Sequence, residues 1–289
     1  MSNRKKKVAW LSVVSNTVLI ILKVIAGILS GSVSIISEAI HSGMDLAASG
    51  IACFSVQVSS KPADKNHPYG HGKIENISGV VEGLLIFVAA FLIIKEAMVK
   101  ILHPNEIEIS QEYIAIAVMA IAAIINTIVA GILYKVAKEE DSVALEADAL
   151  HLKTDVYTSL GVAIGLLLIK LTGITILDPI VAILVALLIV KEAWHLCSTA
   201  FIPLLDASIS EEEELKIKEV LDTYNGRIKE YHELRTRKSG NMRYIDFHLL
   251  VDGRVTVDEA HALCEEIEKS IEQKLKNTNI NIHIEPSGN

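Results

Sequence analysis

Two eight-residue stretches of the chain share one pattern: EAIHSGMD at residues 38–45 and DALHLKTD at residues 148–155. Each places a histidine four residues before an aspartate, His41 with Asp45 and His151 with Asp155. On a helix, side chains four residues apart lie on one face, about 6 Å from each other. Together the two copies offer two nitrogen and two oxygen ligands, a set that suits tetrahedral zinc or another divalent first-row metal.

The alternative is that these four polar residues merely lie among apolar ones, as a buried histidine often does. Both copies, however, lie in hydrophobic stretches long enough to cross a bilayer. A charged side chain is costly there and usually marks a transport path or a paired site. The surroundings therefore favour a metal site.

The composition indicates a membrane protein. The chain has 289 residues, of which 51% are hydrophobic and 5% aromatic, and its mean hydropathy is +0.41. A soluble enzyme is rarely so apolar. Cys53, Cys197 and Cys264 stand far apart, so neither a disulfide framework nor a thiolate zinc finger is indicated. The basic run at residues 4–7 leads into an apolar segment that is too long for a cleavable signal peptide. The run is therefore interpreted as the basic flank of a membrane-anchoring segment.

Six apolar segments predict six transmembrane helices, because each has at least about 20 residues. They are Val8–Leu29, Val33–Val58, Ile77–Ile101, Tyr113–Tyr134, Val143–Leu171 and Ile176–Leu196.

The connecting segments predict the orientation through their basic residues. Lys and Arg occur before the first segment and in the second and fourth connections, whereas residues 30–32, 102–112 and 172–175 contain none. This alternation predicts that both termini lie in the cytoplasm.

The two His-Asp copies fall on the second and fifth segments, which run in opposite directions. Both aspartates then lie near the middle of the bilayer. Matching motifs on antiparallel helices are typical of secondary transporters, whose substrate site lies where two repeats meet. The repetition seen here is local and covers only these eight residues.

The second connection contains a further set of metal-type ligands, Asp64, His67 and His71, in a segment whose proline and two glycines predict a turn. Two histidines four residues apart and a nearby carboxylate are able to form a small metal site. A solvated loop with two incidental histidines is the alternative, and the spacing does not decide between them.

After Leu196 the composition changes, which divides the chain into a transport domain, residues 1–200, and a soluble domain, residues 201–289. Residues 206–289 hold 12 Lys or Arg against 18 Asp or Glu. Capping boxes at Ser210 and Thr256 predict helices to about Tyr224 and Lys276. Strands are predicted at Ile228–Arg237, Arg243–Val251 and Ile280–Glu285, which gives the order αββαβ and a small sheet covered by helices on one face.

Alternation in those strands collects metal-type ligands on the polar face. His248 lies opposite the apolar face of the second strand, and His283 and Glu285 lie opposite the isoleucines of the third. His232 in the first strand and His261 in the second helix complete the set. Scattered histidines of a solvated surface are the alternative.

These features together resemble the cation diffusion facilitator family, from about Arg4 to Pro286. They are six spans, His-x3-Asp in the second and fifth, the loop HPYGHGKIE at residues 67–75, and an αββαβ tail with LRTR at residues 234–237. The resemblance implies a homodimer that exports divalent metal, commonly zinc, in exchange for protons. It also implies a cytoplasmic α+β domain of the ferredoxin or metallochaperone type.

Carried over to this sequence, the resemblance assigns three metal sites. The transport site is His41, Asp45, His151 and Asp155, the loop site is Asp64, His67 and His71, and the binuclear cytoplasmic site at the dimer interface is His232, His248, His261, His283 and Glu285. Other members often have Asp where this chain has Glu285, so the reach of that ligand differs. His41 resembles the zinc-selective branch and argues against manganese, which favours oxygen ligands.

The expected function is export of a divalent cation, most of all Zn²⁺, by a metal/proton antiporter of the cell membrane. Zn²⁺ is expected both as the transported ion and as a structural or regulatory ion in the cytoplasmic domain, with Cd²⁺, Fe²⁺ and Co²⁺ as alternative substrates. Expected partners are a second copy of the chain, divalent ions, protons and the lipid bilayer, but no nucleic acid.

Two other classes use comparable ligands. One is an intramembrane zinc hydrolase, which needs three protein ligands to the zinc, an open coordination position and a general base. This chain has no HExxH motif, and the only further carboxylates near the His-Asp motifs are Glu38 and Asp148. A metal-gated channel is the second alternative. The four convergent ligands favour a transporter, which is not an enzyme.

Overall fold

The computed structural model describes residues 3–30, 33–102, 113–172, 174 and 176–287, without the side chains of some helical residues. The chain forms two compact units, Met1–Phe201 and Ile202–Asn289, which are described separately below.

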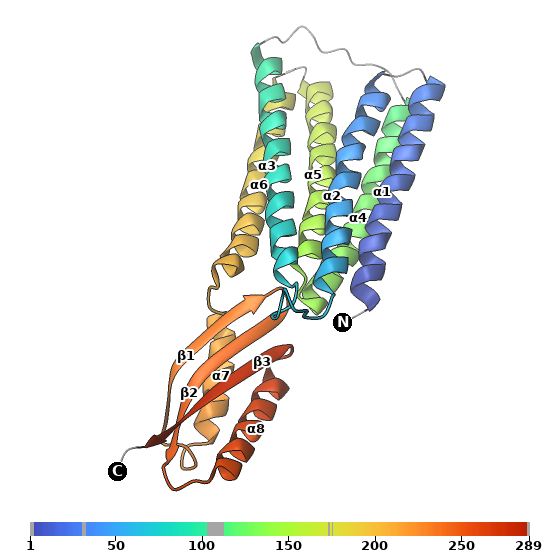
Figure 1. Ribbon diagram of the computed structural model, residues 1–289. Coiled ribbons are helices and arrows are strands. Elements are labelled where there is room, and N and C mark those ends of the chain that lie inside the picture. Colours follow the sequence, from blue (N-terminus) through green and yellow to red (C-terminus); the bar gives the residue numbers. More distant parts are fainter. Residues whose placement is uncertain (1–2, 31–32, 103–112, 173, 175, 288–289) are drawn as a thin grey trace. The chain divides into compact units, whose positions relative to one another are not determined.

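The first unit consists of long helices (Figure 1). They are α1 (Asn3–Ser30), α2 (Val33–Ser59), α3 (Lys73–Leu102), α4 (Tyr113–Glu140), α5 (Val143–Thr172) and α6 (Leu177–Phe201). All six lie where the apolar segments predict helices. Several extend past the apolar run into polar residues, since a helix continues until a chain-breaking signal and not until hydrophobicity ends. Between α4 and α5 the break comes at Asp141, whose φ is 52°.

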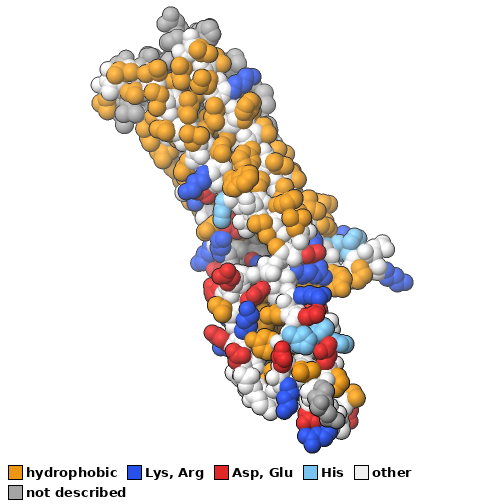
Figure 2. Space-filling model, turned by 90° about the vertical axis from the view of Figure 1, so that its left-hand side faces the viewer, with side chains coloured by type: hydrophobic (Ala, Val, Ile, Leu, Met, Phe, Trp, Pro, Cys, Tyr) orange, Lys and Arg blue, Asp and Glu red, His pale blue; other side chains and the backbone are white. Residues whose placement is uncertain are grey.

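The helices of this unit expose many large apolar side chains, and their interior holds polar residues as well as apolar ones. Large hydrophobic side chains such as Trp10, Val14 and Phe91 are exposed, and Figure 2 shows hydrophobic atoms covering the helices. Ser12, Asn16 and other polar residues are buried. An exposed apolar surface of this extent requires lipid around it.

Among the described residues, four helical stretches are long and apolar enough to cross a membrane: Asn3–Ile25 in α1, Lys73–Val99 in α3, Ala120–Glu140 in α4, and Pro179–Leu205, which begins in α6 and ends in η2 (Ile202–Leu205). The helices α2 and α5, which carry the His-Asp motifs, are not among them. For these two the transmembrane assignment remains a prediction.

Helix packing brings the two motif helices together. The most extensive helix contacts are those of α3 with α6, α1 with α2 and α4 with α5, and α2 also packs on α5. Both helices bury small residues, Ala48 and Ala52 on α2 and Ala144 and Ala149 on α5, and residues of this size let membrane helices approach closely. A buried network links the helix ends as well, because the ammonium of Lys5 on α1 lies 2.7 Å from the Glu75 carboxylate on α3.

The second unit has the predicted αββαβ order. After the short 3-10 helix η2 (Ile202–Leu205), it contains α7 (Glu211–Thr223), β1 (Glu230–Ser239), β2 (Met242–Asp252), α8 (Val257–Lys274) and β3 (Thr278–Ser287). The sheet order is β1-β2-β3, with β1 antiparallel and β3 parallel to β2. The crossover through α8 is what allows β2 and β3 to be parallel.

One face of the sheet carries the core, as the alternation of apolar residues predicts. Ile245, Phe247 and Leu249 are at most 1% exposed and pack with the buried residues of α7 and α8. Both helices therefore lie on that face. The opposite face of β2, with Asp246 and His248, is left for polar contacts.

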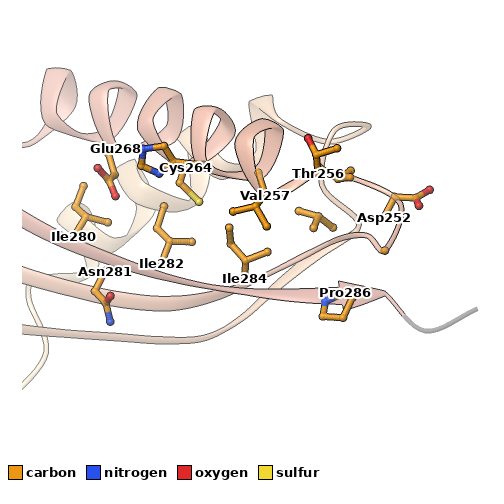
Figure 3. A pocket seen from close by; sticks show the side chains of 15 residues that line it. Asp252, Thr256, Val257, Cys264, Glu268, Ile280, Asn281, Ile282, Ile284 and Pro286 are labelled. Atoms are coloured by element: carbon orange, nitrogen blue, oxygen red, sulfur yellow. The ribbon is translucent and has the colours of Figure 1, made fainter.

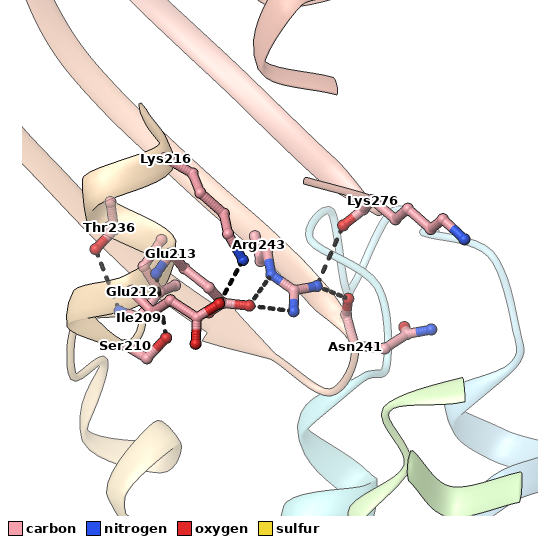
Figure 4. Close-up of polar contacts among 9 residues, drawn as sticks. All are labelled: Ile209, Ser210, Glu212, Glu213, Lys216, Thr236, Asn241, Arg243 and Lys276. Carbon is pink, nitrogen blue, oxygen red and sulfur yellow. Dashed lines mark hydrogen bonds and ion pairs between the residues drawn. The ribbon is translucent and has the colours of Figure 1, made fainter. Parts of the chain in front are cut away.

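The predicted capping box at Thr256 is complete, but the one at Ser210 is only half formed. The Ser210 hydroxyl accepts the Glu213 backbone N–H at 3.3 Å. The Glu213 carboxylate does not return to the helix start, because it accepts hydrogen bonds from the guanidinium of Arg243 on β2 (Figure 4). This ion pair ties α7 to the sheet.

Candidate metal centres

The helical unit brings together a carboxylate of α2 and two ligands of α5. The Nε2 atom of His151 lies 3.2 Å from Oδ1 of Asp45. One ligand atom each from Asp45, His151 and Asp155 lie within 4.8 Å of one another. Asp45 and His151 are buried, 6% and 8% exposed. Bulk water therefore has little access to these two side chains, and a cation bound by them would take most of its ligands from the protein.

His41 lies on α2, four residues before Asp45, but its side chain is outside the described part of the structure. The helix places it on the same face as Asp45. Its membership of the cluster remains a prediction. Of the two carboxylates near the motif, Glu38 is likewise undescribed, and Asp148 is fully buried.

Hydrogen bonds from the neighbouring helix α1 fix the position of the Asp45 turn of α2. The side-chain amide of Asn16 on α1 donates to the Asp45 backbone oxygen at 3.4 Å and to the Ser49 hydroxyl at 3.2 Å. One turn of α2 thus receives two hydrogen bonds from α1. These bonds hold the Asp45 carboxylate against α5.

The loop before α3 also gathers its three predicted ligands. Oδ1 of Asp64 accepts the backbone N–H groups of Asn66 at 2.9 Å and His67 at 2.7 Å. The imidazole of His67 lies 3.1 Å and that of His71 lies 3.4 Å from the same carboxylate. Gly70 allows the tight turn, since its φ is +79°.

The backbone contacts fix the charge of this loop carboxylate. The N–H of His67, more than any other group, lowers the pKa of Asp64 by stabilising its charged form. The loop therefore presents an anion to the two imidazoles before any metal arrives.

In the second unit the sheet register builds a third cluster. His232 faces His248 across the β1–β2 pair, and His248 faces His283 across the β2–β3 pair. Glu285 lies two residues further along β3 on the same face. Its carboxylate is 3.0 Å from Nδ1 of His248 and 3.3 Å from Nε2 of His232. These three residues form the compact cluster.

The two remaining predicted cytoplasmic ligands lie outside that trio. Nε2 of His283 is 3.8 Å from the Glu285 carboxylate, and its ring is 4.7 Å from the His248 ring. His261 lies on α8, 3.4 Å from Glu265 of the same helix. It lines a cavity of about 520 Å³ between α8 and β3, which Figure 3 shows with Ile280, Ile282 and Ile284 on one wall. Within one subunit His261 does not reach the trio.

Glu233 is a neighbour of this cluster that the sequence pattern misses. Strict alternation places it on the helix-covered face, opposite His232. A β-bulge between His232 and Arg235, with Glu233 at φ 50°, turns the residue toward the polar face instead. Its carboxylate lies 3.9 Å from Nε2 of His248, so this imidazole lies between two carboxylates.

Each of the three clusters offers nitrogen and carboxylate oxygen ligands, a mixture that suits zinc and related divalent ions. A bundle with an apolar outer surface and an internal cluster of this kind defines a membrane protein that handles metal cations.

Comparison with known proteins agrees with this class. Residues 9–205 match the cation efflux transmembrane domain, and residues 209–287 match the cytoplasmic domain of cation efflux proteins. The chain belongs to the cation diffusion facilitator family and is a cation efflux transporter.

Individual relatives cover nearly the whole chain. The uncharacterized transporter sll1263 of Synechocystis sp. is 37% identical over 265 residues, which are 92% of this chain and 85% of the relative. The cation-efflux pump FieF of Shewanella oneidensis is 30% identical over 276 residues, 95% of this chain and 92% of the pump. Among solved structures, the metal-bound C-terminal domain of the CzcD transporter from Thermotoga maritima is 27% identical, covers 28% of this chain and 98% of that domain, and has a TM-score of 0.26.

Proposed function

We propose that this transporter exports Zn²⁺ from the cytoplasm in exchange for protons, through a site made of His41, Asp45, His151 and Asp155. The observation that carries the proposal is the contact of Asp45 with His151 inside the helical unit. Two carboxylates cancel the charge of a divalent ion, and the side chains replace the water that the ion loses in hydrocarbon. Two imidazoles favour zinc over ions that prefer oxygen.

Proton exchange follows from the same ligands. Metal binding requires neutral imidazole, and histidine is the side chain whose ordinary pKa lies closest to neutral pH. Protons that reach His41 and His151 from the outer side therefore compete with the metal and favour its release. The counter-flow of protons supplies the driving force.

The second unit is proposed to act as a zinc-dependent clamp in a homodimer. His232, His248 and Glu285 hold one ion within a subunit, whereas His261 is exposed and lies away from them. His261 and His283 are then available to a further ion shared with the partner subunit. Metal binding that exists only in the closed dimer stabilises that form. The N- and C-termini are assigned to the cytoplasm, and the protein to the cell membrane.

The deciding experiment is zinc uptake by proteoliposomes that contain the purified full-length chain. An imposed pH gradient, acidic inside, is expected to drive Zn²⁺ inward against its own gradient. Uptake that never exceeds equilibrium would indicate a channel. Zinc-dependent cleavage of membrane peptides by the detergent-purified protein would instead indicate a hydrolase.

A further inference from the structure

One buried carboxylate joins four helices at the end of the helical unit where α2 ends and α3 and α5 begin (Figure 1). Glu75, in the first turn of α3, is 1% exposed. Its Oε1 atom accepts hydrogen bonds from the ammonium of Lys5 on α1 and from the hydroxyl of Ser59 at the end of α2, both at 2.7 Å. Its Oε2 atom accepts from the hydroxyl of Ser142, the residue before α5. Lys5, Ser59 and Ser142 are buried as well.

The two hydroxyl donors belong to the helices that carry the proposed transport site. Along its helix, Ser59 lies roughly 21 Å from Asp45, and Ser142 lies roughly 14 Å from His151. Asp45 and His151 touch deeper in the unit, at 3.2 Å. The Glu75 carboxylate thus holds α2 and α5 together at one end, and these two helices separate there only when its hydrogen bonds break.

The contacts of Glu75 are of a kind that opens readily in water. Breaking them exposes a carboxylate, an ammonium and two hydroxyls, which water hydrates, so the net cost of each hydrogen bond is small. A carboxylate in the first turn of a helix also remains favourably placed in the helix dipole. The Ser59 hydroxyl has a second acceptor, the Val56 backbone oxygen at 3.2 Å. Ser59 is therefore able to leave Glu75 without losing its hydrogen bond.

The start of α3 has a separate attachment that does not involve Glu75. The side-chain amide of Asn76 donates to the backbone oxygen of Ala200 on α6 at 3.2 Å, and α3 with α6 is one of the most extensive helix contacts. The pair α3 and α6 therefore forms a frame, from which Glu75 reaches the ends of α2 and α5.

We propose that Glu75 is a positioning residue for transport, and that with Lys5, Ser59 and Ser142 it forms a cytoplasmic gate between α2 and α5. The proposal rests on the proposed transport function and on the orientation predicted from the basic connections. When both hydroxyls are bound to Glu75, the gate is closed. Their release lets the helix ends separate, so that an ion from the cytoplasm reaches the transport site. The gate closes again before the ion leaves on the other side, as alternating access requires.

A native cysteine reports on this movement. Cys53 lies on α2 between Asp45 and Ser59, is 4% exposed, and packs with residues of α1, α4 and α5. Separation of α2 from α5 exposes its thiol to water. With Cys197→Ala and Cys264→Ala, Cys53 is the only cysteine left in the chain. Its rate of reaction with a methanethiosulfonate reagent then measures how often the gate is open.

The test variant removes both hydroxyls and leaves the ion pair of Lys5 with Glu75 in place, so that no buried charge loses its partner. Ser59→Ala removes the contact with α2. Ser142→Gly removes the contact with α5; the Ser142 backbone oxygen accepts the Glu146 N–H, which makes Ser142 the N-cap of α5, and glycine is nearly as good as serine at that position.

In the detergent-purified full-length chain, this double variant should react at Cys53 about 10-fold faster than the parent, because allosteric couplings of this kind change equilibria about 5- to 150-fold. Ser60→Ala is the matched control, since the Ser60 hydroxyl donates to the Val56 backbone oxygen at 2.5 Å, and it should react at the parental rate. Ser142→Thr keeps a hydroxyl and an N-cap and should also behave like the parent.

Transport kinetics in proteoliposomes separate a gate from a purely structural contact. An open gate loads readily and closes poorly, so the double variant should reach half-maximal uptake at about 5-fold less Zn²⁺ and have a maximal rate about 5-fold lower. Unchanged reactivity of Cys53 in the folded double variant overturns the proposal. A lower maximal rate with an unchanged half-maximal concentration also overturns it, since that result assigns the hydroxyls a structural role.

Size-exclusion profiles identify a double variant that fails to fold, and Ser59→Ala alone then undergoes the same two measurements. Absence of zinc transport by the parent would refute the proposed function. The Cys53 reaction would still decide whether Glu75 holds α2 and α5 together.

Discussion

His151 on α5 and Asp45 on α2 are 106 positions apart in the sequence, yet Nε2 of the first lies 3.2 Å from Oδ1 of the second. His151 supplies a nitrogen atom and Asp45 supplies an oxygen atom. Their contact joins the two halves of a ligand set that the repeated motif supplies separately.

Replacing Asp45 with Asn should abolish zinc transport. The amide keeps the shape but removes the charge that balances the ion, and loss of even an outer partner of a metal ligand typically costs roughly 10- to 100-fold in affinity or activity. We expect uptake into proteoliposomes to fall more than about 100-fold. Glu140→Gln at the end of α4 is the control and should transport normally. Unimpaired uptake by Asp45→Asn would remove this residue from the transport site.

Replacing His41 with Asp should change selectivity without stopping zinc. The substitution leaves one nitrogen and three oxygen ligands, which relaxes the discrimination against Mn²⁺ and other ions that prefer oxygen. Competition by Mn²⁺ and Cd²⁺ against Zn²⁺ uptake measures the change. Identical competition profiles for parent and variant would show that selectivity is determined elsewhere.

Replacing Asp64 with Asn should weaken zinc binding at the loop site. The lowered pKa of the Asp64 carboxyl means that the contribution of its charged form is present above the unfolded pKa and is lost only as pH falls through the lower folded value. The loop therefore keeps this anion at neutral pH, and its removal should lower zinc affinity about 10- to 100-fold. Zinc titrations at neutral pH measure the change, with Lys65→Ala as a control that keeps parental affinity; equal affinities in Asp64→Asn and the parent would contradict it.

The cytoplasmic cluster should depend on His232 and Glu233 to different extents. His232→Ala removes one of three clustered ligands and should weaken zinc binding there more than about 100-fold, whereas Glu233→Gln removes only a nearby charge and should weaken it about 10-fold. Both variants should still transport zinc, but a higher zinc concentration should be needed to activate transport. The exposed Glu230→Gln variant is the control. Equal affinities in Glu233→Gln and the parent would mean that the bulge has no role in metal binding.

Arg243→Ala should destabilise the second unit. Its guanidinium holds the Glu213 carboxylate of α7 against β2, and both side chains are at most 19% exposed. Removing one partner leaves a partly buried charge without its hydrogen bonds, which costs about 1–3 kcal/mol. Chemical unfolding of residues 202–289 measures the loss, and Arg254→Ala, at a solvent-exposed pair with Asp252, should leave the midpoint unchanged. A midpoint for Arg243→Ala equal to that of the parent would contradict the tie between α7 and the sheet.

The sequence by itself determined where the helices and strands of this protein lie and which residues of a strand face the core. Apolar length marked the helices, and alternation in β2 separated Phe247 from His248, because both patterns reflect local backbone geometry that repeats along the chain. Such information is contained within a few residues.

Only the tertiary structure decided which of these residues meet. The contact of Asp45 with His151 depends on packing between α2 and α5, and the left-handed bulge at Glu233 reverses the face that alternation assigns. Long-range packing and local breaks in periodicity are properties of the folded chain, so a pattern with a period of two or 3.6 residues does not contain them.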